Sequence, residues 1–202
     1  MTGEPEQDAT GRKPVRRPRL TPARESEFLR ATLDVLRTAG YEALSMEAVA
    51  ARAQCSKATL YRLHGTKQRL VAAAVSSQRP HRDTPLDTGS LRGDLLAHAQ
   101  RDAAAVEDSA AVFWAVAHAS LHDAELRAAL HTVFIDPETA ELDAAVERAV
   151  ARGELPRRPA AAAHIGRLAF GSVLARSLEG QIPPTYLASL VDEVLLPALR
   201  HS

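Results

Sequence analysis

A cluster of cationic, hydroxyl and aromatic side chains follows Ser56 within the length of one short helix. It comprises Lys57, Thr59, Tyr61 and Arg62, and Lys67 comes shortly afterwards. Side chains of these types hydrogen-bond to phosphate oxygens and to base edges in the major groove of DNA. The cluster therefore predicts binding chemistry, although a solvated basic helix in an ordinary bundle would show the same residue types.

Two short predicted helices place this cluster next to a tight turn. Ser45 can cap the first helix, Ser56 can cap a second helix over residues 57–63, and the two helices meet at residues 54–56. Such a pair forms a helix-turn-helix, whose second helix can enter the major groove. Lys67 would open the following helix, where free backbone N–H groups also favour a phosphate.

The chain divides by composition into four predicted segments. Residues 1–20 form a disordered basic arm, 21–75 a helix-turn-helix DNA-binding domain, 76–89 a linker, and 90–202 a larger domain. The arm could enter a minor groove or only attract phosphates nonspecifically, and its acidic residues and prolines favour the second role.

Charge and cysteine content narrow the function classes. Residues 1–70 hold 13 Lys/Arg against 8 Asp/Glu, whereas residues 71–202 hold 12 against 17. A basic N-terminal part on a chain without net charge predicts a polyanion as partner, and nucleic acid is the first candidate. One cysteine excludes an internal disulfide, and the absence of a long apolar run or a secretory signal leads us to expect a cytoplasmic location and no membrane partner.

The fold class is predicted to be all-α, with about nine helices. β-branched and aromatic residues are sparse, and no segment alternates long enough to predict a strand. Thr21 and Pro22 begin a first helix that Gly40 ends. In the larger domain we expect a kink or break at Pro137 and helices over 90–106, 109–120, 123–152, 159–180 and 184–200.

The segment from Phe28 to Leu70 resembles the DNA-binding domain of the TetR/AcrR family of bacterial transcriptional regulators. The resemblance rests on the runs at 39–41, 44–50, 56–61 and 67–70. It implies that Thr59 and Tyr61 contact DNA and that Lys67 holds a phosphate, with Lys57 and Arg62 as contributors. We group the capping residues Ser45 and Ser56 with this DNA-binding set.

Three positions depart from the family pattern. Gln54 replaces a glycine that usually tolerates positive φ in the turn, and Cys55 replaces a small aliphatic residue. His64 stands where a large apolar residue usually packs, so it is either buried and neutral or a partly exposed phosphate contact. Cys55 could be a redox switch, but simple packing in the turn explains it better.

The resemblance implies that the larger domain dimerises and usually holds a small-molecule pocket. Candidate pocket residues are Phe113, Trp114, His118, Phe134, Arg167 and Phe170. Candidate dimer-interface residues are Gly166, Ala169, Gly171, Ala175, Leu187, Leu190, Val191 and Val194. Both sets could instead fill the core of the protomer, because apolar spacing alone does not separate these roles.

The remaining motifs favour no enzyme and no cofactor. His118 and His122 have metal-ligand spacing, but histidines at this spacing are common by chance, and we assign no metal site. No phosphate-binding glycine loop and no nucleophile elbow is present. We expect a homodimeric regulator, most simply a repressor, which binds an inverted-repeat operator in double-stranded DNA and is released by a small-molecule effector. A regulator controlled by a protein partner is the alternative, and an α-helical enzyme a remote one.

Overall fold

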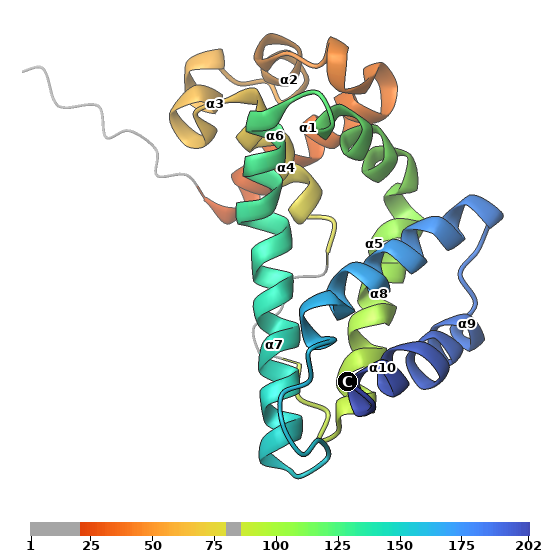
Figure 1. Ribbon diagram of the computed structural model, residues 1–202. Helices are drawn as coiled ribbons and strands as arrows, with labels where there is room; N and C mark the ends of the chain where they lie inside the picture. Colours follow the sequence, from red (N-terminus) through yellow and green to blue (C-terminus); the bar gives the residue numbers. More distant parts are fainter. Residues whose placement is uncertain (1–20, 80–85) are drawn as a thin grey trace, which may run out of the picture.

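The computed structural model describes residues 21–79 and 86–202, and within these ranges all regular structure is helical. Figure 1 shows two parts, with α1–α4 gathered at one end and α5–α10 forming a larger body that extends away from them. The all-α prediction is confirmed. The predicted arm at 1–20 and residues 80–85 of the predicted linker lie outside the described residues.

The first part consists of α1 (Pro22–Ala43), α2 (Met46–Arg52), α3 (Lys57–His64) and α4 (Lys67–Ser76). Thr21 caps α1 as expected, because its side chain accepts a hydrogen bond from the Arg24 backbone N–H. Gly40 interrupts the helical backbone of α1 with φ of 76°, a conformation that glycine adopts without a Cβ penalty. The helix predicted to end at Gly40 therefore does end there, and residues 41–43 form a further turn.

The body begins with α5 (Leu91–Ser120), a single helix where two were predicted. The expected break appears as a kink at Ser109, whose φ and ψ are −146° and 23°. The Ser109 hydroxyl accepts a hydrogen bond of 2.9 Å from Arg37 of α1. The kink thus lies where α1 packs against α5 and provides a polar contact between the two parts.

The helix that follows is continuous from α6 (Ala124–Leu130) through the π-helical turn η1 (His131–Ile135) into α7 (Asp136–Ala151). Pro137 has no N–H to donate to the carbonyl of Val133 four residues earlier, and its ring crowds that turn. The π turn accommodates the proline, and the Ser76 hydroxyl donates a 2.9 Å hydrogen bond to the Val133 carbonyl. The predicted interruption at Pro137 is therefore a π turn contacted by the end of α4.

The chain ends in two more helices that pack on α5. The first is α8 (Ala162–Arg176), which continues as the 3₁₀ turn η2 (Ser177–Glu179). The second runs from α9 (Pro184–Ser189) through the π turn η3 (Leu190–Leu195) to α10 (Leu196–Arg200). Counted as continuous rods, the helices within the described ranges number eight, one fewer than predicted because α5 is not divided.

Two apolar cores hold these helices together. The larger core runs from Phe28 and Leu36 of α1 through Leu70 of α4 into the upper body at Val106 and Phe113. The smaller core joins the lower ends of α5, α7 and α8 to the last helix. Because the larger core crosses from α1–α4 into the body, a movement of the body acts directly on the packing of α1 and α4. No described helix is long and apolar enough to cross a membrane.

Candidate nucleic-acid interface

The turn between α2 and α3 is held by its own backbone and by Arg24. Ser45 caps α2 by accepting from the Ala48 N–H, and Ser56 caps α3 by accepting from the Thr59 N–H, each at 3.1 Å. Gln54 lies in the left-handed region with φ of 49°, as its replacement of a glycine predicted. The Arg24 guanidinium donates to the carbonyls of Ala53 and Gln54 at 3.0 and 3.1 Å, a contact that sequence reasoning missed.

The outer face of α3 presents the cluster of polar residues to solvent. Leu60 is fully buried and anchors the helix, while Lys57, Tyr61 and Arg62 are exposed. Tyr61 is 45% exposed, and no acidic partner of Arg62 occurs among the described residues. Ala58 is also exposed and lies beside Tyr61 and Arg62 on the outward surface. Thr59 is half-buried, and its hydroxyl lies 2.8 Å from that of Ser56.

Lys57 is paired across the turn. Its ammonium group forms an ion pair with Glu47 of α2 and lies 5.7 Å from the centroid of the Tyr61 ring. Hydrogen bonding to Glu47 raises the pKa of Lys57, and hydrogen bonding to Lys57 lowers the pKa of Glu47. Both groups are exposed to solvent, so the pair orients Lys57 more than it stabilises the fold.

Lys67 is already bound to another residue of the protein, Tyr41. Its Nζ donates to the Tyr41 carbonyl at 2.7 Å and lies 4.1 Å from the centroid of the Tyr41 ring. Burial lowers the pKa of Lys67. Of its three donors, two remain available for a phosphate oxygen.

His64 and Cys55 lie behind the exposed face. His64 is half-buried, its Nε2 has no hydrogen-bond partner, and burial lowers the pKa of its imidazole, which favours the neutral form. Burial also raises the pKa of the Cys55 thiol, which disfavours the reactive thiolate. These surroundings agree with the packing interpretations of both residues.

Asp123, at the start of α6, connects the body to α1 and α4. Its carboxylate accepts a 2.6 Å hydrogen bond from the Tyr41 hydroxyl and a 3.0 Å bond from Gln68, and it caps α6 through the Leu126 N–H. The Tyr41 hydroxyl, the Leu126 N–H and Gln68 together hold the pKa of Asp123 at about 2, and burial with the adjacent carboxylate raises that of Tyr41. We call these groups the Tyr41–Asp123 contact.

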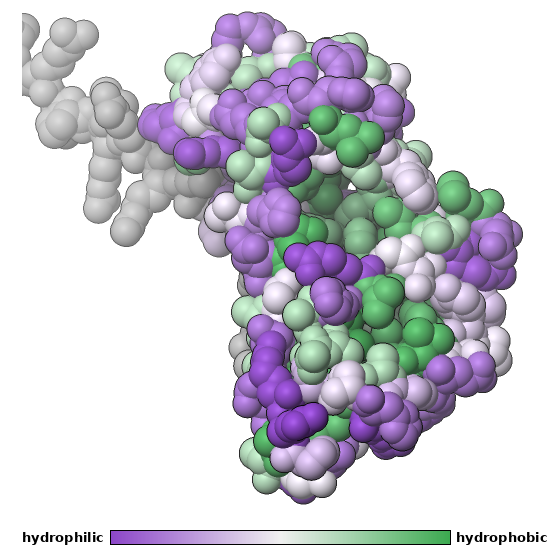
Figure 2. Space-filling view, viewed as in Figure 1, coloured by the Kyte–Doolittle hydropathy of each residue, from purple (hydrophilic) through white to green (hydrophobic). Residues whose placement is uncertain are grey.

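The predicted ligand residues divide into two groups. Phe113, Phe134 and Phe170 meet with ring centroids 5.4 to 5.9 Å apart. Phe134, Phe170 and Arg167 line a cavity of about 190 Å³ between α5, α7 and α8. Figure 2 shows a hollow with apolar residues around it on this face of the molecule.

Trp114 and His118, by contrast, point away from the cavity. Trp114 is 38% exposed, and His118 lies exposed on α5 with its ring against that of His122. Their assignment to the pocket is corrected, because both side chains lie on the exposed side of α5 and neither lines the cavity.

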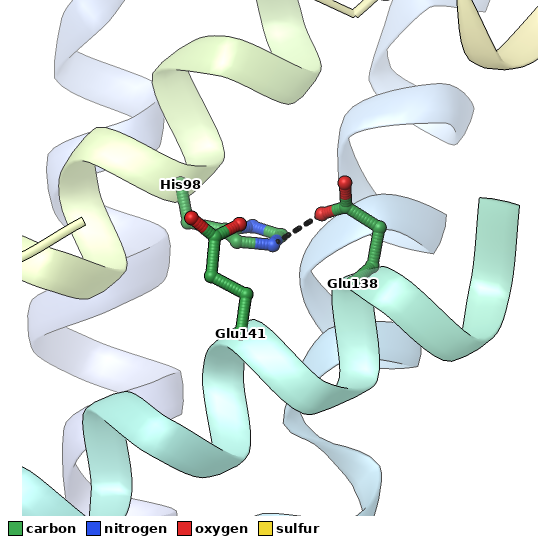
Figure 3. Close-up of side chains that lie close together, drawn as sticks. All are labelled: His98, Glu138 and Glu141. Carbon is green, nitrogen blue, oxygen red and sulfur yellow. Dashed lines mark ion pairs between the residues drawn. The ribbon is translucent and has the colours of Figure 1, made fainter. Parts of the chain in front are cut away.

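A buried ion cluster adjoins the cavity, and sequence reasoning missed it. It consists of Arg79, His98, Arg101, Asp102, Glu138 and Glu141. Figure 3 shows His98 of α5 pointing toward Glu138 and Glu141 of α7, with His98 Nε2 2.7 Å from a Glu138 oxygen. The signal available in the sequence was spacing, because His98 and Asp102 continue the buried stripe of Leu91 and Leu95.

Opposite charges within the cluster shift the pKa values of His98 and Glu138. Burial alone would lower the pKa of His98, but Asp102 and Glu138 on its two sides raise it. Burial alone would raise the pKa of Glu138, but His98, Arg79 and Arg101 hold it at about 2. The atoms of His98, Glu138 and Glu141 are close enough to ligate a metal ion, but Arg101 Nη2 already lies 2.8 and 2.5 Å from the two glutamates. The arrangement is therefore an ion-pair network.

The predicted dimer-interface residues also divide. Ala169, Leu187, Leu190 and Val191 are buried in the core of the protomer and cannot form an exposed face. Gly166 lies against Leu142 of α7 and lines the cavity. Gly171, Ala175 and Val194 remain exposed. Gly171 and Ala175 share a helix face with other exposed apolar residues of α8 and η2, namely Leu168 and Leu178.

Comparison with known proteins places these features in a family. Residues 28–74 match the family model of bacterial regulatory proteins of the tetR family, and residues 85–194 match the tetracyclin repressor-like C-terminal domain. An uncharacterized HTH-type transcriptional regulator of Mycobacterium tuberculosis is 35% identical over 181 residues, which cover 89% of each chain. The DNA-binding transcriptional repressor TetR of Mycobacteroides abscessus is 33% identical over 187 residues, covering 88% of this chain and 94% of that protein.

A solved structure supports the same fold. The crystal structure of a TetR-family transcriptional regulator from Rhodococcus sp. has a TM-score of 0.71 at 20% identity, covering 89% of this chain and all of that one. The exposed face of α3 on its capped turn, above an all-helical body, defines a DNA-binding transcriptional regulator of the helix-turn-helix class. Its relatives are named as regulators and not as enzymes. The chain belongs to the tetR family of bacterial regulatory proteins.

Proposed function

We propose that this regulator is a homodimeric repressor that acts in the cytoplasm, binds an inverted-repeat operator through α3, and releases it when a small molecule occupies the cavity beside Phe134 and Phe170. The observation that carries the proposal is the outward face of α3. Tyr61 and Arg62 are exposed there and free of acidic partners among the described residues, while Leu60 fixes the opposite face in the core. Such a helix can enter the major groove without rearranging its own packing.

The roles of the other cluster residues follow from their contacts. Ser45 and Ser56 set the starts of α2 and α3, where free backbone N–H groups can approach phosphates. Lys57 is oriented by Glu47 toward the same surface, and Thr59 lies at its edge. Lys67 contributes its remaining donors to a phosphate beside the first turn of α4.

Dimer formation would use the exposed apolar side of α8. Leu168, Gly171, Ala175 and Leu178 recur at intervals of three or four residues, which places them on one helix face. Gly171 and Ala175 allow a second helix to approach closely. A twofold dimer would present two copies of α3 to successive turns of one face of the duplex, about 34 Å apart.

Control by a ligand is supported by the position of the cavity. Arg79, three residues after the end of α4, lines it, so occupation of the cavity acts on the end of a helix that begins beside α3. Control requires a ligand that binds one conformation of the dimer more tightly than the conformation that fits the operator, namely one in which the two copies of α3 are wrongly spaced. Such a ligand lowers operator affinity by the ratio of its affinities for the two conformations, and the operator lowers ligand affinity by the same factor. The repressor assignment draws on the name of the Mycobacteroides abscessus relative.

Selection of bound duplexes from a random pool at near-physiological salt tests the proposal. The expected result is enrichment of an inverted repeat by a protein whose mass in solution is twice 21.7 kDa. The Tyr61→Ala variant, as a folded control, should lose the enrichment. Recovery of no repeat by a folded protein, or of an isolated half-site by a monomer, would contradict the proposed mode of binding.

A further inference from the structure

The Arg79 side chain lies among aromatic rings and carboxylates, the groups that make up binding sites for organic cations. Its guanidinium carbon lies 4.1 Å from the centroid of the Phe134 ring and 5.1 Å from that of Phe170. One guanidinium nitrogen lies 2.9 Å from Asp102, and another pairs with Glu138. Aromatic faces and carboxylates together bind a delocalised cation strongly when water is excluded, and the Arg79 side chain is only 7% exposed.

The same side chains face empty space. Arg79, Phe134, Glu138 and Phe170 all line the cavity of about 190 Å³. This volume is below the roughly 300 Å³ at the lower end of common ligand sites. Because Arg79 forms part of the wall, its withdrawal would enlarge the cavity and expose the groups that now hold the guanidinium.

The charge balance of the buried ion cluster specifies what could replace Arg79. The guanidinium of Arg79 pairs with the carboxylates of Asp102 and Glu138, which also lie on the two sides of His98 and raise the pKa of its imidazole. Withdrawal of Arg79 would remove one positive charge from beside these two carboxylates at a site of low exposure, where an uncompensated charge is costly. A ligand with a single positive charge replaces the charge that Arg79 supplied, whereas a neutral compound leaves the carboxylates uncompensated and an anion adds to their negative charge.

The rim of the cavity does not reverse this preference. Arg167 of α8 lines the opening, but its side chain is exposed and donates to the Ala163 carbonyl of its own helix. Solvent and salt screen a charge in that position. The groups that are shielded from solvent, Asp102 above all, therefore dominate the selection of charge.

We propose that the cavity binds an apolar organic monocation, such as a protonated aromatic amine or a small quaternary ammonium compound, which replaces Arg79 between Phe134, Phe170 and Glu138. The inference rests on the proposed function, because it names the chemistry of the effector and the residue through which the effector acts. The Arg79 backbone N–H donates to the Ser76 carbonyl at 3.2 Å, so the displaced side chain is tied to the last turn of α4. Its release removes a fixed attachment of α4 to the body.

Binding to the full-length protein without DNA tests the site directly. The probes are 2-phenylethylammonium, 2-phenylethanol and 3-phenylpropanoate, which share a phenyl group and chain length but differ in charge. Calorimetric titration of wild-type protein should give an affinity for the cation at least about tenfold above that for the alcohol, and no saturable binding of the carboxylate. Equal affinities, a preference for the carboxylate, or no binding of the cation at millimolar concentration would overturn the proposal.

A variant without the Arg79 guanidinium, which competes with the ligand for the same position, gives a sharper test. Arg79→Met should bind 2-phenylethylammonium at least about tenfold more tightly than wild type, because the site no longer has to release a bound guanidinium. Arg148→Met is the matched control, since Arg148 also pairs with a buried carboxylate, Asp94 at 3.1 Å, but does not line the cavity. It should leave the cation affinity unchanged. An unchanged affinity in Arg79→Met would refute displacement.

Loss of Arg79 leaves buried carboxylates unpaired and lowers stability, so a second variant is included. Arg79→Lys keeps the charge but loses the planar group that lies against Phe134 and Phe170, and it should bind the cation more tightly than wild type by a smaller factor. The cation should also raise the melting temperature of Arg79→Met more than that of wild type. The absence of both effects would count against the proposal even if Arg79→Met were largely unfolded.

The outcomes separate this inference from the proposed function. If the cation binds as expected but a saturating concentration leaves operator affinity unchanged, the ligand chemistry stands and the proposed release fails. If no cation binds, yet a compound of another class releases an inverted-repeat operator, the proposed function stands and the inference about the cavity falls.

Discussion

Replacement of Tyr41 by phenylalanine tests how firmly α1 and α4 are held to the body. The change removes one hydroxyl from a ring that is 7% exposed and creates no cavity, because the two rings have the same shape. It breaks the 2.6 Å hydrogen bond to the carboxylate of Asp123, and Asp123 keeps its bonds from Gln68 and the Leu126 N–H. The variant therefore isolates one charge-assisted bond of the Tyr41–Asp123 contact.

The expected loss of stability at neutral pH is modest. A hydrogen bond to a charged group contributes about 1.5–3 kcal/mol. Water reaches the half-exposed Asp123 and replaces part of what the hydroxyl supplied, so we expect a loss of about 1–2 kcal/mol. For a chain of this size, that corresponds to a fall in melting temperature of about 2–8 °C, measurable by calorimetry or circular dichroism.

The pH dependence distinguishes this bond from ordinary packing. Hydrogen bonding holds the pKa of Asp123 at about 2 in the folded protein, below the ordinary value of 3.8 for an aspartate side chain. A depressed carboxyl pKa stabilises the fold above the unfolded pKa, and this stabilisation is lost as the pH falls through the folded pKa. The difference in the free energy of unfolding between wild type and Tyr41→Phe should therefore be constant from neutral pH to about pH 5. It should become smaller below about pH 4.

Tyr186→Phe is the matched control. The Tyr186 hydroxyl donates to the Ser172 carbonyl at 3.2 Å, a neutral acceptor, so its loss should cost about 0.5–1.5 kcal/mol without a pH dependence in this range. A Tyr41→Phe difference that stays constant into acid, or that matches the Tyr186→Phe profile, would refute the assignment of Asp123 as the charged acceptor.

Three further substitutions test the recognition surface. Tyr61→Ala should reduce operator affinity by about 1–3 kcal/mol with an unchanged melting temperature. The control Trp114→Ala removes an exposed aromatic side chain of the body and should leave operator affinity unchanged. A loss of fold in Tyr61→Ala would mean that Tyr61 belongs to the core. Lys67→Ala should weaken all duplexes about equally, flatten the salt dependence by about one unit of slope, and lower the melting temperature because its contacts with Tyr41 are lost. A sequence-selective effect would contradict the phosphate role. Gln54→Gly should raise stability by up to about 1 kcal/mol, since it relieves a left-handed backbone, and a lower melting temperature would show that the Gln54 side chain stabilises the turn.

The features that the sequence predicted well are those set by neighbouring residues. Caps at Thr21, Ser45 and Ser56 depend on a hydroxyl and on N–H groups two or three residues away, and all three occur as expected. The run of polar residues after Ser56 is likewise local, because a single short helix decides which side chains face outward. Local chemistry thus sufficed to locate the helix that we propose reads DNA.

The features that the sequence did not predict depend on contacts between distant segments. Arg79 lies in what composition indicated was a linker, and its partners Asp102 and Glu138 come from two other helices. Arg24 reaches the turn at Gln54 from a helix about 30 residues away in sequence. No periodicity within one helix indicates such a pairing.

Apolar spacing could not distinguish a core from an interface. Leu187 and Val191 repeat at helical intervals just as Leu168 and Ala175 do, but the first pair is buried in the protomer and the second pair is exposed. Both arrangements remove the same apolar surface from water, so hydropathy carries no information about which chain supplies the partner. Only the positions of α8 and the last helix relative to α5 separated the two sets.

The π turn before α7 gives the two parts of the protein a defined alignment. A regular helix would use the Val133 carbonyl internally, and only side-chain packing, which tolerates small sliding movements, would then set how far α4 lies along α7. Because Pro137 has no N–H to bond that carbonyl, the Ser76 hydroxyl meets an acceptor at one height along the helix. The π turn therefore fixes the position of α4 along the helix that contains α7. Because α3 precedes α4 directly, the position of α3 relative to the body is fixed with it.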